Sequence, residues 1–154
     1  MIIQHQNLTN LASAILHAAG APENNAKAVA AHLVEAHLKG HDSHGVGMIP
    51  SYVRSMKAGH INPANDAKLI KDNGAVVTFD AELGLGRVVG MQAMELGIER
   101  AKQLGICCVA LGNAAHLGRI GAFGEACADA GLVSTHYVNV VGHDPMVVAY
   151  GGRD

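Results

Sequence analysis

The sequence predicts a mixed α/β fold in which an amino-terminal helical lobe, residues 1–64, precedes a helix-on-sheet domain that occupies residues 65–154. Three observations support this fold class. Apolar residues recur at three- and four-residue spacing through the first lobe, as in amphipathic helices. From residue 75 onward, short β-branched runs alternate with longer helical patterns, as in helices that pack on a sheet. Hydrophobic residues make up 49% of the chain, which is enough to build a core.

Three helices are expected in the first lobe, each ended by a glycine. The first begins near the possible caps Asn7 or Thr9, and the second has Pro22 in its first turn, where proline is well tolerated. The segment 62–66, Asn-Pro-Ala-Asn-Asp, predicts a connector, and we place the lobe boundary there. The expected helices lie between residue 8 and Gly20, between Pro22 and Gly40, and between Ile49 and Gly59.

The second domain is expected to follow a β-α-β-α-β order. Strands are predicted where β-branched and apolar residues run together, and helices where the apolar period lengthens. Gly105 and Gly131 end the two helices. The predicted strands are 75–79, 106–111 and 132–138, and the predicted helices are 88–101 and 120–130.

Charge and composition exclude several classes of partner. The net charge is −2, and the 11 Lys and Arg residues are scattered singly, so no basic surface for nucleic acid or an anionic membrane is expected. No apolar run is long enough to span a membrane, and residues 1–10 lack the apolar stretch of a signal peptide, so a cytoplasmic protein is expected. Cys107, Cys108 and Cys127 form neither a disulfide framework nor a CxxC pattern, and buried free thiols are predicted.

A first cluster of candidate site residues lies at residues 37–44. Helical spacing of four and three would place His37, His41 and His44 on one face, beside Asp42, which is a possible metal site. The other interpretations are ordinary loop polarity and a contact with a cofactor or substrate. Asp42 could also cap the helix that follows.

A glycine-rich segment, residues 84–90, follows a predicted strand and opens a helix, as a dinucleotide-binding loop does. Its glycine spacing differs by one residue from that motif. The next strand also ends in Leu-Gly-Asn at 111–113, without the acidic residue that would bind a ribose hydroxyl. We therefore interpret this segment as a structural turn, in which Arg87 could still meet an anion.

The third candidate is the segment 113–121, between a predicted strand and a predicted helix, where α/β sheets present side chains to ligands. His116 could exchange a proton with a substrate hydroxyl near neutral pH. Gly118, Arg119 and the amides at the helix start could receive a phosphate or carboxylate. The alternative is a polar loop with a helix cap.

Four motifs in this order resemble the malate/L-lactate dehydrogenase family, whose members are NAD(P)-dependent 2-hydroxyacid oxidoreductases with a non-Rossmann fold. Within that family, the chain shares motifs with the hydroxycarboxylate dehydrogenase B group. The motifs are Gly-His-Asp-Ser-His-Gly at 40–45, Met-Ile-Pro-Ser-Tyr-Val-Arg at 48–54, Gly-His-Ile-Asn-Pro at 59–63 and His-Leu-Gly-Arg-Ile-Gly at 116–121.

The resemblance implies the roles of individual residues. His116 would accept the proton when the hydroxy acid is oxidised and donate it when the oxo acid is reduced, and His44 would contact NAD. Gly118, Arg119 and Ile120 would form part of the cofactor cradle. NAD, or alternatively NADP, is the implied cofactor, a small 2-hydroxy or 2-oxo acid the implied substrate, and a homodimer the implied state of the complete enzyme.

The chain departs from the family in two ways. Many relatives carry arginine where this chain has Met48, so no residue is assigned to the substrate carboxylate, and Arg54 is a weak substitute. Family enzymes are roughly twice as long, which implies that residues 65–154 are only the start of the cofactor-binding domain. We therefore expect poor stability and little dehydrogenase activity from these residues alone, because a cut sheet exposes an edge and an apolar face. The competing interpretations are an inactive amino-terminal remnant and a small histidine-based metal-binding protein.

Overall fold

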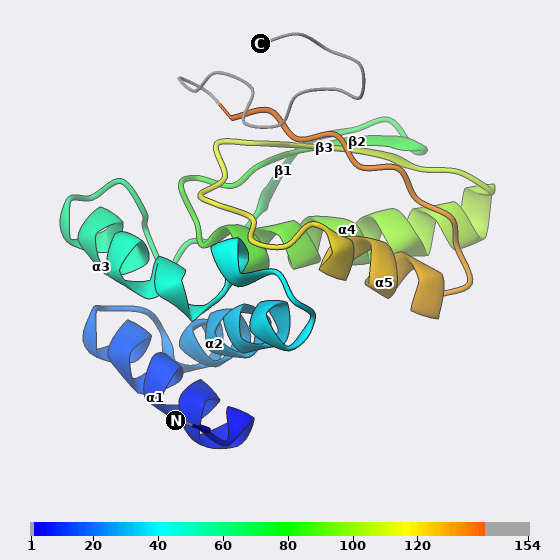
Figure 1. Cartoon of the computed structure of the whole chain (residues 1–154). Helices are drawn as coiled ribbons and strands as arrows, with labels where there is room; N and C mark the ends of the chain where they lie inside the picture. Colours follow the sequence, from blue (N-terminus) through cyan, green and yellow to red (C-terminus); the bar gives the residue numbers. More distant parts are fainter. Residues whose placement is uncertain (1, 141–154) are drawn as a thin grey trace, which may run out of the picture.

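The computed structural model describes residues 2–140 and confirms a mixed α/β fold. Figure 1 shows a group of helices at one end of the molecule and a sheet at the other, with two further helices on the side of the sheet that faces the group. In chain order, the elements are α1 (His5–Ala18), α2 (Glu23–Leu38), the 3-10 turns η1 (Asp42–His44) and η2 (Val46–Met48), α3 (Ile49–Lys57), β1 (Lys68–Asp72), β2 (Val76–Asp80), α4 (Gly86–Leu104), β3 (Cys108–Gly112) and α5 (Gly121–Asp129).

The three expected amino-terminal helices are present. Gly20, Gly40 and Gly59 follow them with φ of +111°, +76° and +75°, values that disfavour residues with a Cβ and so end the helices. Helix α1 begins at His5, slightly before the expected caps. The apolar faces pack into one core cluster that also contains Leu85, from beyond the expected lobe boundary. The helices and the start of α4 are therefore joined by shared buried surface.

The sheet has the order β1-β2-β3. Strand β1 is antiparallel to β2, whereas β2 and β3 are parallel, with Val77 opposite Val109. Parallel neighbours need a long crossover, which α4 supplies before it ends at Gly105 in the left-handed conformation. The buried side chains of Val77, Phe79 and Ala93 form a second core cluster between sheet and helix.

Two predictions for the second domain are wrong. Strand β1 was not predicted, and every one of its residues is exposed, so it lacks the buried apolar face on which strand prediction depends. The predicted strand 132–138 is absent: residues 132–140 pair with no other segment of the described chain, and Val133 and Tyr137 are almost fully exposed. In the described part, the order is therefore β-β-α-β-α and not β-α-β-α-β.

The prediction of buried thiols holds only for Cys127. Cys107 is half-buried and Cys108 is exposed. The cause is that alternate residues of β3 point to opposite faces of the sheet, and Cys108 belongs to the exposed set. None of the helices in residues 2–140 is both long and apolar enough to cross a membrane.

Candidate active site

The loop between β3 and α5 brings His116 against residues from two other segments. Its Nδ1 lies 2.8 Å from the hydroxyl oxygen of Tyr52, which is on α3. Its ring also stacks on that of His44, at the end of η1, with 5.3 Å between ring centroids and 27° between planes. Two histidines that are far apart in the sequence, both assigned to the site by the resemblance, therefore lie against each other.

Tyr52 is buried, and its hydroxyl is directed entirely at His116. The same oxygen lies 3.5 Å from the backbone carbonyl of His116, to which it can donate. Burial raises the pKa of Tyr52 to about 12, so its hydroxyl stays protonated at neutral pH. When the imidazole carries its proton on Nδ1, it donates to Tyr52, and Nε2 keeps a lone pair for a proton from a ligand.

The surroundings of His116 favour its neutral form. Partial burial lowers the pKa of His116 below its ordinary value, and the positive charge that a protonated His44 carries lowers it further. His44 is oriented in turn by Ser43, whose hydroxyl oxygen lies 2.9 Å from its Nδ1. A neutral imidazole with an exposed surface is suited to accept a proton.

Gly86, in the glycine-rich segment, lets α4 begin directly against the site loop. A Cβ at this position would lie 2.3 Å from the carbonyl oxygen of Ala115 and 2.4 Å from that of His116. Only a residue without a side chain permits this contact. Arg87, the next residue, places its guanidinium 5.6 Å from the ring centre of Phe123. In this structure, the glycine-rich segment thus supports the site loop by packing.

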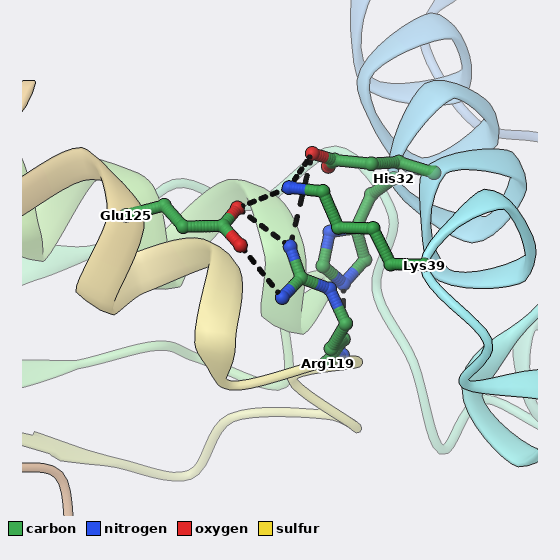
Figure 2. A network of polar contacts seen from close by, with 5 residues as sticks. His32, Lys39, Arg119 and Glu125 are labelled. Carbon is green, nitrogen blue, oxygen red and sulfur yellow. Dashed lines mark hydrogen bonds and ion pairs between the residues drawn. The ribbon is translucent and has the colours of Figure 1, made fainter.

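The predicted cradle residues Gly118, Arg119 and Ile120 form the turn that leads into α5. Gly118 has a φ of +77°. Arg119 is buried, and its guanidinium donates to both carboxylate oxygens of Glu125 at 3.0 and 2.7 Å (Figure 2). Ile120 is half-buried and lines a small apolar cavity with Leu117. The charge of Arg119 is therefore already balanced within the protein.

A polar network connects this turn to α2, as Figure 2 shows. The backbone N–H of Arg119 donates to Nε2 of His32 at 3.0 Å. The ammonium group of Lys39 contacts Glu125 and lies 2.8 Å from a carboxylate oxygen of Glu35. Hydrogen bonds from Arg119 and Lys39 lower the pKa of Glu125 to about 2, so this carboxylate stays charged near neutral pH.

The histidines of the first candidate cluster do not form a metal site. Nδ1 of His37 accepts the backbone N–H of Val46 at 3.1 Å, while the ring of His44 stacks on His116. Within residues 2–140, no three His, Cys, Asp or Glu side chains are close enough to hold a metal ion. The expectation that one helix face carries all three imidazoles is therefore wrong, because α2 ends at Leu38. Asp42 makes no side-chain cap to η1.

Sequence reasoning missed the contacts that Tyr52, His32 and Glu125 make with the loop between β3 and α5. Tyr52 and His32 lie on apolar helix faces and resemble core residues by their spacing. A signal existed for both, since a buried hydroxyl or imidazole needs a hydrogen-bond partner. No comparable signal exists for Glu125. Met48, which stands where many relatives carry arginine, packs against the core cluster, and Arg54, the weak substitute for that arginine, is exposed.

Comparisons with known proteins show which family this chain belongs to. The malate/L-lactate dehydrogenase family matches residues 3–154. Hydroxycarboxylate dehydrogenase B of Escherichia coli O157:H7 is 52% identical over 149 residues, which is 97% of this chain and 41% of that protein. L-sulfolactate dehydrogenase of Methanocaldococcus jannaschii is 38% identical over 154 residues, which is 100% of this chain and 44% of that protein.

Solved structures of dehydrogenases share the fold of this chain. The sulfolactate dehydrogenase of Methanocaldococcus jannaschii superposes with a TM-score of 0.80 at 43% identity, covering 84% of this chain and 38% of that one. The malate dehydrogenase of Pyrococcus horikoshii OT3 superposes with a TM-score of 0.81 at 34% identity, covering 85% and 38%. The chain spans less than half the length of the curated relatives it matches. By sequence and by fold, the chain belongs to the malate/L-lactate dehydrogenase family.

Proposed function

We propose that this chain contributes the proton-transferring part of an NAD(P)-dependent dehydrogenase that interconverts a small 2-hydroxy acid and its 2-oxo acid. One observation carries the proposal: His116, at the carboxyl side of β3, is held by Tyr52 and stacked on His44. Membership of a dehydrogenase family supports it. Relatives of the chain are named for hydroxycarboxylate, sulfolactate, lactate and malate, and the last three of these are 2-hydroxy acids.

The proposed proton transfer takes place at Nε2 of His116. During oxidation of the hydroxy acid, this nitrogen takes the hydroxyl proton, and Tyr52 accepts a hydrogen bond from Nδ1–H of the imidazolium that forms. During reduction of the oxo acid, the proton returns by the same route. The lowered pKa of His116 favours the direction in which it begins neutral, which is oxidation. Reduction needs the protonated form and should therefore be favoured by lower pH.

The bound nicotinamide supplies the hydride acceptor or donor of this reaction. The described residues fit such a group, because the half-exposed ring of His44 offers a flat surface beside His116, and Ile120 offers an apolar contact. Since Glu125 and Glu35 balance the guanidinium of Arg119 and its backbone N–H binds His32, we propose that Gly118 and Arg119 contribute to the cradle by fixing the shape of the turn that presents Ile120.

The finer assignments extend the same proposal. We propose NAD as the cofactor, with NADP as the alternative, a homodimer for the complete enzyme, a cytoplasmic location, and a lobe boundary between residues 64 and 65. The apolar Met48 favours a larger and less polar acid than malate as substrate. This substrate preference is contradicted if malate proves to be the best substrate of the complete enzyme.

The proposed cofactor site can be tested by titrating the purified chain with NADH and following NADH fluorescence. Because contact with an aromatic ring contributes about 0.5–1.5 kcal/mol, His44→Ala should weaken binding roughly two- to tenfold. The matched control is His41→Ala, which removes an exposed histidine from the same segment. A folded chain that binds no NADH, or that responds equally to both substitutions, would contradict the site.

A further inference from the structure

His32 links α2 to the turn that follows His116. The imidazole is buried, with 2% of its surface exposed, and its Nε2 accepts the backbone N–H of Arg119 at 3.0 Å. The two residues are 87 positions apart in the sequence. A nitrogen that accepts must carry no proton, so this bond fixes the neutral tautomer with the proton on Nδ1.

The fit around this bond is tight. A Cβ on Gly118 would lie 2.2 Å from Nε2 of His32 and 2.6 Å from its Cδ2. Real side chains do not approach so closely, so the ring reaches Arg119 only because residue 118 is glycine. Within residues 2–140, the buried Nδ1 of His32 has no hydrogen-bond partner, which is a cost that the packing of this ring must offset.

Burial, with the charges that face His32, keeps this imidazole neutral. Burial is the main cause that lowers its pKa to about 4, and the guanidinium of Arg87, on α4, is the second. Arg119 and His116, from the loop, act in the same direction, while Glu35, on α2, acts against it. The Nε2 lone pair is therefore available throughout the neutral pH range.

Helix α2 and Lys39, the residue that follows it, also hold the side chain of Arg119. Glu35 lies 3.7 Å from its Nη2, and Lys39 binds Glu125, the carboxylate that accepts two hydrogen bonds from the guanidinium (Figure 2). Helix α2 thus contacts both the backbone and the side chain of Arg119, which lies three positions after His116.

We propose that His32 is a positioning residue for His116. By accepting the N–H of Arg119, it holds the 116–119 turn in the shape that keeps the His116 ring against Tyr52 and His44. The relevance of this effect to proton transfer rests on the function proposed above, but the geometric effect can be measured without any turnover.

Two substitutions separate the hydrogen bond from the bulk of the ring. The side-chain oxygen of His32→Gln can still accept the Arg119 N–H, whereas His32→Leu fills similar space without an acceptor. Two readouts on the full chain follow the turn: hydrogen exchange of the Arg119 amide, and the midpoint of the His116 titration by NMR.

In His32→Leu, we expect exchange of the Arg119 amide to be about tenfold faster, as the loss of one buried hydrogen bond allows. The His116 midpoint should rise as the ring becomes more exposed, because burial is the main cause that lowers its pKa. His32→Gln should keep both values close to those of the unsubstituted chain. A merely structural role would lower global stability in both variants without separating them in these two readouts.

The proposal is overturned if a folded His32→Leu variant keeps both values, or if His32→Gln behaves like His32→Leu. If His32→Leu does not fold, nitrogen chemical shifts of the unsubstituted chain decide the question. They must show that His32 is neutral at pH 7 with its proton on Nδ1, and a proton on Nε2 refutes the proposal. Loss of NADH binding plays no part in this test, so the proposed function can fail independently of it.

Discussion

The most informative substitution in this structure is Gly118→Ala, because it adds one methyl group at the contact between the site turn and α2. Gly118 combines a positive φ of +77° with a predicted Cβ position 2.2 Å from Nε2 of His32. A Cβ in the left-handed conformation costs about 1–2 kcal/mol by itself. The contact with His32 adds a further cost, which depends on how far the buried ring can move.

That further cost can be worked out from the packing. Loss of the hydrogen bond between Arg119 and His32 contributes about 0.5–1.5 kcal/mol. Overpacking in a filled interior contributes about 1–3 kcal/mol. Gly118→Ala should therefore lower the free energy of unfolding by roughly 3–6 kcal/mol, of which roughly 2–4 kcal/mol comes from the contact alone.

Gly131→Ala is the matched control. Gly131 follows α5 with a φ of +78°, almost the value at Gly118, and nothing lies within 4 Å of its predicted Cβ. The two variants should therefore share the conformational cost and differ only in the contact. Urea unfolding followed by circular dichroism gives both free energies. A double variant, Gly118→Ala with His32→Ala, should lose most of the additional cost, because the added methyl group then has room.

Equal destabilisation by Gly118→Ala and Gly131→Ala would refute this reasoning, since the contact with His32 would then have no energetic consequence. The same conclusion would follow if the double variant showed no coupling between positions 118 and 32.

Three further predictions concern charge. The pKa of Glu125, about 2, lies below its ordinary value, so the contribution of this carboxylate to stability should be lost as pH falls from about 4.5 to 2. Glu125→Gln should remove that pH dependence. At pH 7 it should lower the free energy of unfolding by about 1–2 kcal/mol, a value reduced because the side chain is partly exposed. The pKa of His32 is lowered from 6.5 to about 4, so the folded state binds its proton less readily than the unfolded state. Stability should therefore fall by up to about 3 kcal/mol as pH drops from 6.5 to 4, and His32→Gln should reduce this loss in urea titrations at each pH. The titration of His116, followed by NMR, should have its midpoint below 6.5. His44→Ala should raise that midpoint, because a neighbouring positive charge is removed. A midpoint that His44→Ala leaves unchanged or lowers would contradict the electrostatic coupling of the two rings.

The parts of the fold that were predictable are those with local signals. Helical periodicity and the glycines at 20, 40, 59 and 105 located the ends of four helices, because positive φ is a property of single residues. Strand β1 was missed because all its residues are exposed, and the segment 132–138 was wrongly predicted as a strand although it carries the apolar pattern of one. A strand exists only where it has a neighbour to pair with, and the sequence of a segment alone does not show whether that neighbour is present.

In the candidate site, too, some features could be predicted from local sequence and others depend on contacts between distant segments. The roles of His116 and His44 came from motifs that resemble a family, and the structure brings these two rings together. The contacts of Tyr52 and His32 bridge 64 and 87 residues, respectively. Such pairs depend on tertiary packing, so local periodicity predicts their burial and not their partners.

The central claim of this account is that His116 and His44 face the nicotinamide and the substrate. The most direct test is NMR of the histidine rings during titration with NADH, followed by addition of a 2-oxo acid. NADH should shift the resonances of His44 and His116, the oxo acid should shift those of His116 further, and the resonances of the exposed His41 should stay unchanged. NADH binding that leaves both His44 and His116 unaffected would contradict this claim.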